Sequence, residues 1–202
     1  MEYTAWDKAK SKTHLSISYL ESKLGFYSYA DESAALQTDR LLAEHLSRRL
    51  EEAGSMLGEL LNILFELSID TVLSRKIGLL KDSLEIAADE IGIRGFDWKE
   101  PGNELLVRLV LADRQLAEQA AKLCIILRHL VTAAYSARKV RLNDMEAVSS
   151  DFMEALSHDI EKADGILEDI IFTFRERETI CNLKLLSFEK TFEAVKRGIH
   201  RV

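Results

Sequence analysis

Residues 143–199 carry one amphipathic helical pattern of about 57 residues, several times the usual length of a globular helix. No proline interrupts the pattern, and apolar side chains recur every three or four residues, except that Glu178 takes the position between Phe174 and Cys181. These side chains are Met145, Val148, Phe152, Leu156, Ile160, Ala163, Leu167, Ile170, Phe174, Cys181, Leu185, Phe188, Phe192, Val195 and Ile199. A helix of this length extends over roughly 85 Å, too long for a compact domain of 202 residues. The pattern therefore predicts an elongated helical bundle.

The composition of the whole chain also favours helices. It contains one proline, nine glycines and 7% aromatic residues, and it is rich in Leu, Ala, Glu, Lys and Arg. These are good helix formers, whereas the β-branched and aromatic residues typical of strands are few. A net charge of −7 argues against a nucleic-acid partner, because a phosphate backbone would mostly be repelled. We therefore expect an all-α, elongated up-down bundle of four to five helices that binds no nucleic acid.

The helical pattern divides the chain into a single domain, 1–202, of consecutive helices. The expected elements are a short helix over 7–24, a long or kinked helix pair over 32–92, a helix over 103–140 and the final helix over 143–199. Whether the pair is broken near 68–70 stays open, because that stretch has β-branched residues but neither Gly nor Pro. The glycine-rich segment 92–102 is the strongest loop signal.

A very short turn near Arg141, with Asn143 as helix cap, would make the last two helices antiparallel. Residues at the same level would then have numbers summing to roughly 282. In this register Asp113 lies beside Asp169, with no obvious basic partner on the facing helix. Cys124 and Cys181 lie at different levels, which excludes a disulfide between them.

The end of the final helix would project beyond the shorter helix before it. Its apolar face is the interaction surface that we predict: Leu185, Phe188, Phe192, Val195 and Ile199. Residues 179–202 hold five basic and two acidic side chains, whereas 144–178 hold eleven acidic and three basic ones. Antiparallel pairing of two copies would match these charges, so a homodimer is expected. The helix over 7–24 could instead cover this face within the same chain.

The sequence predicts a cytoplasmic protein. The first residues lack an apolar core of signal-peptide length, and no stretch of 18 apolar residues runs without a charge. The basic amphipathic end could lie on an anionic membrane, but Glu189 and Glu193 dilute its positive face, so membrane contact is not expected. The two cysteines lack the spacing of a metal site, and we expect both to be reduced core residues.

Asp113 and Glu178 stand out because each interrupts an apolar stripe. A charged group at a core position is costly unless it is paired, so these two are our buried-charge candidates. Their simplest role is to set helix register or oligomeric state, as polar core residues do in coiled coils. The sharper alternative is a shifted pKa and a part in catalysis.

A second polar group lies on the final helix, where Asp151, Glu154, His158 and Glu161 share one face. Carboxylate and imidazole side chains in such a row can ligate a metal. This face is nearly opposite the apolar stripe, however, which indicates a solvated helix surface. We therefore predict no metal site.

The chain contains none of the common motifs for nucleotide binding or hydrolysis. We expect no catalytic residues and no cofactor. The predicted function is a non-enzymatic scaffold, adaptor or regulatory interaction module that self-associates through apolar helix faces. The alternative is a bundle that binds a small molecule or a metal between its helices, with or without catalysis, through Asp113, Glu178 or other core-facing groups.

Overall fold

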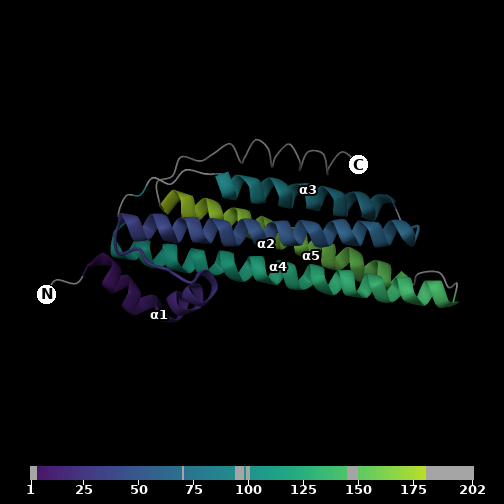
Figure 1. Ribbon diagram of the computed structural model, residues 1–202, viewed down its shortest axis with the longest axis horizontal. Coiled ribbons are helices and arrows are strands. Elements are labelled where there is room, and N and C mark those ends of the chain that lie inside the picture. The colour runs from purple at the N-terminus through teal and green to yellow at the C-terminus, as the bar shows by residue number, and fades with distance from the viewer. Residues whose placement is uncertain (1–3, 70, 94–97, 99–100, 145–149, 181–202) are drawn as a thin grey trace.

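The computed structural model describes residues 4–69, 71–93, 98, 101–144 and 150–180. Within these ranges the protein is an elongated bundle of five helices without strands (Figure 1), which confirms the all-α class. The helices are α1 (Ala5–Leu24), α2 (Glu32–Glu66), α3 (Thr71–Ile93), α4 (Asn103–Asp144) and α5 (Ser150–Ile180).

The four long helices pack in the order α3, α2, α4 and α5, and α1 packs on α4. The extensive contacts are those of α2 with α3 and α4, and of α4 with α5 and α1, whereas α3 touches α5 only slightly. The main core is built from the Leu, Ile and Ala stripes of α2, α3, α4 and α5. A second, smaller core lies between α1 and the first half of α4, and it includes Ile180 of α5. Among the four long helices, the contact between α3 and α5 is therefore the least extensive of those that form.

Helix α1 begins at Ala5, two residues before the predicted start. Thr4 is its N-cap, and a reciprocal capping box joins the Thr4 hydroxyl to the Asp7 N–H and the Asp7 carboxylate to the Thr4 N–H. Asp7 is thus the third helical residue and not the first. The buried face of α1, which includes Trp6, Ile17 and Leu20, packs in the second core with α4.

The predicted helix pair over 32–92 is divided where the sequence left a break open. Helix α2 ends at Glu66, Ser68 takes the left-handed φ of 52°, and α3 begins at Thr71. The Leu67 and Ile69 N–H groups donate to the carbonyls of Ile63 and Leu64, at 3.0 Å each, so the end of α2 is satisfied without a glycine.

Two predicted boundaries near the last turn are wrong. Helix α4 continues to Asp144 instead of ending at residue 140, and α5 begins at Ser150 instead of 143. Asn143 is therefore inside α4 and does not cap α5. The physical reason is that 139–144 contains neither Gly nor Pro, so the cap preference of Asn143 was a weak signal against continuation of the helix. The predicted long helix is described only to Ile180.

Candidate functional site

Both buried-charge candidates lie inside the protein. Asp113, in the middle of the first half of α4, has no exposed surface, and Glu178, near the described end of α5, is 7% exposed. Helix α5 also buries Arg177, which precedes Glu178 and has no exposed surface. A fully buried guanidinium beside a fully buried carboxylate is the most unusual feature of the described residues, because both ions have lost their water.

Arg177 is held by two carboxylates from two other helices. Its Nε donates to Oδ1 of Asp113 on α4 at 2.5 Å, and its Nη1 donates to Oδ1 of Asp39 on α2 at 2.7 Å. Asp39 is itself buried, at 5% exposure. The fork of the guanidinium presents its donors in a fixed plane, so the two carboxylates fix both the height and the rotation of α5 against α2 and α4.

Two tyrosines complete the coordination of Asp113. The hydroxyl groups of Tyr27 and Tyr29 each donate to Oδ2 of Asp113 at 2.7 Å, and Nη2 of Arg177 donates to the Tyr29 oxygen at 3.1 Å. Burial raises the pKa of Tyr27 well above its usual value, and the negative charge of Asp113 raises it further. Tyr27 therefore stays protonated and remains a donor. We call Tyr27, Tyr29, Asp39, Asp113 and Arg177 the polar cluster.

Local sequence chemistry places both tyrosines toward Asp113. Gly25 ends α1 in the left-handed conformation, with φ 78°, and Asp31 begins α2 by accepting from the Ala34 N–H at 2.9 Å. Between them, Ser28 is bound to Thr38 by two hydrogen bonds, from the Ser28 N–H to the Thr38 hydroxyl and from that hydroxyl to the Ser28 carbonyl. The short connection is thus fixed to α2.

Aromatic rings shield the polar cluster. Trp6 of α1 meets Tyr29 edge to face, with ring centroids 5.9 Å apart, and Trp98 of the α3–α4 connection stacks on Tyr29 at 5.3 Å. The rings remove water from around the ions and so strengthen their attraction. The rings therefore enclose an ion network.

The closed geometry limits what the polar cluster can do chemically. Arg177 and Asp113 have no exposed surface, so a substrate cannot reach them while the bundle is intact. The cluster joins α2, α4, α5 and the α1–α2 connection, and its geometry suits a structural role in fixing register. This is the simpler of the two roles considered for Asp113.

Glu178 lies outside these hydrogen bonds and faces a different neighbour. Burial raises the pKa of Glu90 on α3, the charge of Glu178 raises it further, and Arg175 opposes both effects. Glu90 Oε2 is buried without a hydrogen-bond partner. Two carboxylates therefore repel each other where the ends of α3 and α5 meet, and Arg175 compensates only in part.

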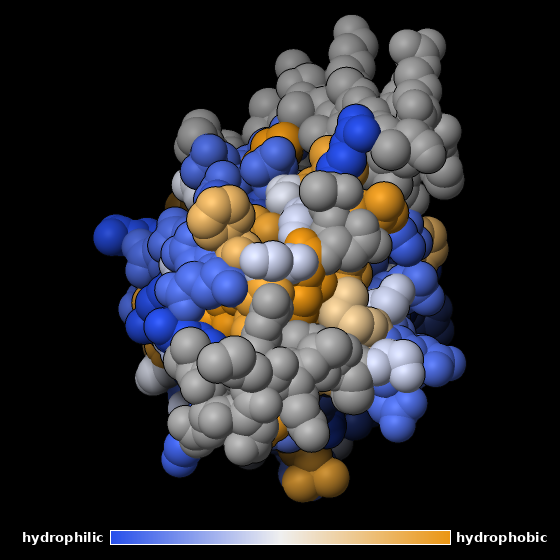
Figure 2. Space-filling view, turned by 90° about the vertical axis from the view of Figure 1, so that its right-hand side faces the viewer, coloured by the Kyte–Doolittle hydropathy of each residue, from blue (hydrophilic) through white to orange (hydrophobic). Residues whose placement is uncertain are grey.

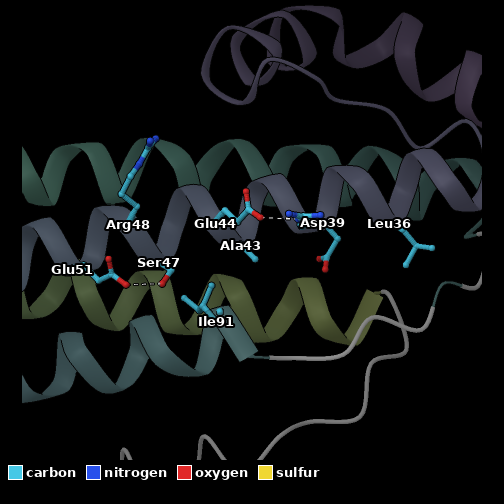
Figure 3. A pocket seen from close by; sticks show the side chains of 10 residues that line it. Leu36, Asp39, Ala43, Glu44, Ser47, Arg48, Glu51 and Ile91 are labelled. Atoms are coloured by element: carbon cyan, nitrogen blue, oxygen red, sulfur yellow. Dashed lines mark hydrogen bonds and ion pairs between the residues drawn. The ribbon is translucent and has the colours of Figure 1, made fainter.

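A groove of about 630 Å³ lies on α2 beside the end of α3 (Figure 3). Asp39 points from this groove toward α5, whereas Arg48 points away on the other side of α2. Other polar side chains of the lining are engaged within the bundle: Arg40 pairs with Glu44 at 2.8 Å, and the Ser47 hydroxyl donates to the Ala88 carbonyl. No set of polar groups converges on the space in this groove, so it does not have the character of a ligand site.

The other candidates are distributed as follows. Asp151, Glu154, His158 and Glu161 are all exposed, in agreement with the solvated face. Cys124 is buried, its thiol donates to the Arg49 carbonyl at 3.3 Å, and burial raises its pKa. Cys181 and the predicted interaction surface, Leu185, Phe188, Phe192, Val195 and Ile199, lie outside the described residues.

The predicted register between the last two helices is wrong. Asp113 lies against Arg177 and not beside Asp169, a difference of eight residues, or about 12 Å along α5. The error follows from the helix bounds, since α4 ends at Asp144 and α5 begins at Ser150, whereas the prediction centred the turn near Arg141.

Sequence reasoning missed four members of the polar cluster as site residues: Tyr27, Tyr29, Asp39 and Arg177. A signal existed for two of them. Asp39 precedes Leu42 by three residues, and Arg177 follows Phe174 by three, so each falls on an apolar stripe.

Comparison of the chain with protein-family models, with curated proteins and with solved structures found no match. The structure adds one observation on whether a helix could cross a membrane. Of the described helices, Asn103–Val140 within α4 is long and apolar enough to cross a membrane by length and composition. This stretch packs against α1, α2 and α5, and the central helix of a bundle meets the same criteria.

Proposed function

We propose that this protein is a non-enzymatic helical scaffold or interaction module that self-associates through its C-terminal segment, residues 181–202, which we call the tail. The observation that carries the proposal is the position of α1. Its apolar residues, among them Trp6, Ile17 and Leu20, are already buried against α4 and the α1–α2 connection. The apolar face of α1 that holds these residues is therefore already occupied and is not available to the tail.

The chemistry of the tail supports a partner helix as the cover. Its predicted surface of Leu185, Phe188, Phe192, Val195 and Ile199 recurs at helical spacing, and apolar faces of this kind usually mark an interface. A second copy of the chain is the simplest partner, because two-fold dimers are the commonest closed assemblies. The enclosed polar cluster supports a non-enzymatic role, since its ionic groups serve the packing of the bundle.

Sedimentation equilibrium of the full chain, compared with a chain ending at Ile180, tests the proposal. The full chain should be dimeric at tens of micromolar, and the shortened chain should be monomeric with unchanged helical content by circular dichroism. A matched control replaces Phe188 and Phe192 by Ser, which keeps the length and charge of the tail and should also give a monomer. A monomeric full chain, or a shortened chain that still dimerises, would overturn the proposal.

A further inference from the structure

Helices α3 and α5 touch only slightly, and a groove lies along the boundary between them. Two adjoining hollows of about 190 Å³ and 300 Å³ share Lys76 on their rims. The first is lined by Leu80 and Ile160, and the second by Val72, Leu73 and Met153. Val72 is 56% exposed, although the neighbouring Leu73 is buried. An apolar floor is therefore open to solvent along the boundary where two core helices meet least.

The rim of this α3–α5 groove is acidic. Glu154, Glu161 and Asp164 line it from α5, and Lys76 is the single basic residue among the lining side chains. Lys76 bridges the groove to Glu161 at 3.5 Å, but both side chains of this pair are largely exposed. An exposed ion pair contributes little to stability, so a ligand of positive charge can displace it at small cost.

One end of the groove opens where α3 and α5 begin. Figure 2 looks at that end of the bundle and shows apolar surface near its centre, bordered by polar residues. From Met153 to Asp164 the groove follows eleven residues of α5, or about 16 Å. A helix lying along it would place three of its apolar positions on the floor.

We infer that the α3–α5 groove receives the tail of a second copy of this chain. The inference rests on the proposed function and names the surface that the tail binds. The tail carries five basic and two acidic side chains, the complement of the rim, and its apolar residues match the floor. Its 22 residues give at most about 33 Å of helix, enough to span the groove. In a two-fold dimer each copy would supply one tail and one groove.

A second copy is favoured over the chain's own tail by the sequence that follows Ile180. The tail contains no proline, and its single glycine, Gly198, lies close to the end of the chain. A tight reversal directly after α5 would have only Asn182 as a residue that commonly ends helices. Continuation of the helix away from its own bundle is the simpler path.

Charge reversal on the rim tests the inference by sedimentation. The variant E161K/D164K should raise the dimer dissociation constant about tenfold at low salt, and the effect should shrink as salt screens the charges. The matched control is E168K/D169K, which changes the net charge equally, because Glu168 and Asp169 are exposed on α5 but do not line the groove. The control should retain the dissociation constant of the unchanged chain. Equal constants for E161K/D164K and E168K/D169K would overturn the groove as the docking surface.

Photocrosslinking identifies the occupant directly. The variant Val72→p-benzoylphenylalanine, mixed with unmodified ¹⁵N-labelled chain, should give crosslinked peptides that join the groove to residues 181–202 of the labelled copy. The same replacement at Ile125, which is exposed on α4 outside the groove, should give none. Crosslinks confined to one isotope would show that the chain's own tail fills the groove, and this would overturn the inference. A dimer that depends on the tail but does not crosslink from Val72 would leave the proposed function standing and reject this groove.

Discussion

Replacing Arg177 by Met tests whether the polar cluster is held by buried charge. Met fills much of the same volume but removes the donors to Asp113, Asp39 and Tyr29. Asp113 would keep its two tyrosine donors, whereas Asp39 would lose its guanidinium. Two carboxylates with 0% and 5% exposure would then lose the guanidinium that they share. Removing one partner of a buried ion pair costs about 3–5 kcal/mol, because a charge is left without compensation.

The assay is urea unfolding followed by circular dichroism, which gives the free energy of unfolding and the denaturant slope. R177M should lose about 3–5 kcal/mol, a large share of the 5–15 kcal/mol typical of a domain. The matched control is R40M, which changes the net charge equally. Arg40 pairs with Glu44 on the surface, where the two side chains are 79% and 56% exposed. That replacement should cost less than about 1 kcal/mol.

A third variant separates the loss of charge balance from the loss of shape. D39N/D113N/R177M removes all three charges, and buried ion clusters can often be replaced by neutral groups at little cost. This variant should therefore be more stable than R177M, and it keeps the test available if R177M does not fold. The reasoning is refuted if R177M and R40M lose the same free energy, or if the triple variant is no more stable than R177M.

Three further predictions concern single side chains. Burial lowers the pKa of His45, and Arg49 lowers it further, so the unfolded chain binds the extra proton more readily. Stability should fall as the pH drops below the unfolded pKa, by up to about 1.4 kcal/mol per pH unit, and H45L should remove this slope in urea titrations from pH 7 to 5. E90Q should stabilise the protein at pH 7, because it removes the repulsion from Glu178. The gain in stability should vanish once the pH falls through the raised pKa of Glu90, because the protonated carboxyl is neutral as well. Thermal melts at pH 7 and pH 4 check this. G25A should cost about 1 kcal/mol at its φ of 78°, whereas G165A, inside α5 with open space at the added Cβ, should be neutral or stabilising.

The helices could be predicted from the sequence because apolar stripes are a local property. The apolar stripe of α2 ends before Ser68 and that of α3 begins after it. The sequence left open whether the helix breaks there, and the φ of 52° at Ser68 shows that it does. The error at the last turn has a local cause as well. Asn143 has a preference for caps, but the preference of one residue is weaker than the continuation of a helix already packed against its neighbours.

The polar cluster was predictable only in part. Asp113 is recognisable because a charge on an apolar stripe needs a partner, but which partner depends on register, and an eight-residue shift replaces Asp169 by Arg177. Tyr27 and Tyr29 reach Asp113 from more than 80 positions away along the chain. Such contacts depend on the path of the connection after Gly25, which apolar periodicity does not describe.

The polar cluster is buried, whereas the charged rim of the α3–α5 groove faces solvent. This difference bears on how the protein would associate. At the polar cluster, charges are enclosed by tyrosine and tryptophan rings, so the register of α2, α4 and α5 is fixed before any partner binds. Along the α3–α5 groove, the ion pair of Lys76 and Glu161 is largely exposed above an apolar floor, so its partners can be exchanged at small cost. The residues that fix α5 lie at the level of Arg177, whereas the groove lies between Met153 and Asp164. A helix can therefore bind in the groove without changing the register of α5 against α2 and α4. The difference in urea midpoint between R177M and the parent protein should therefore be the same in the full chain and in a chain that ends at Ile180.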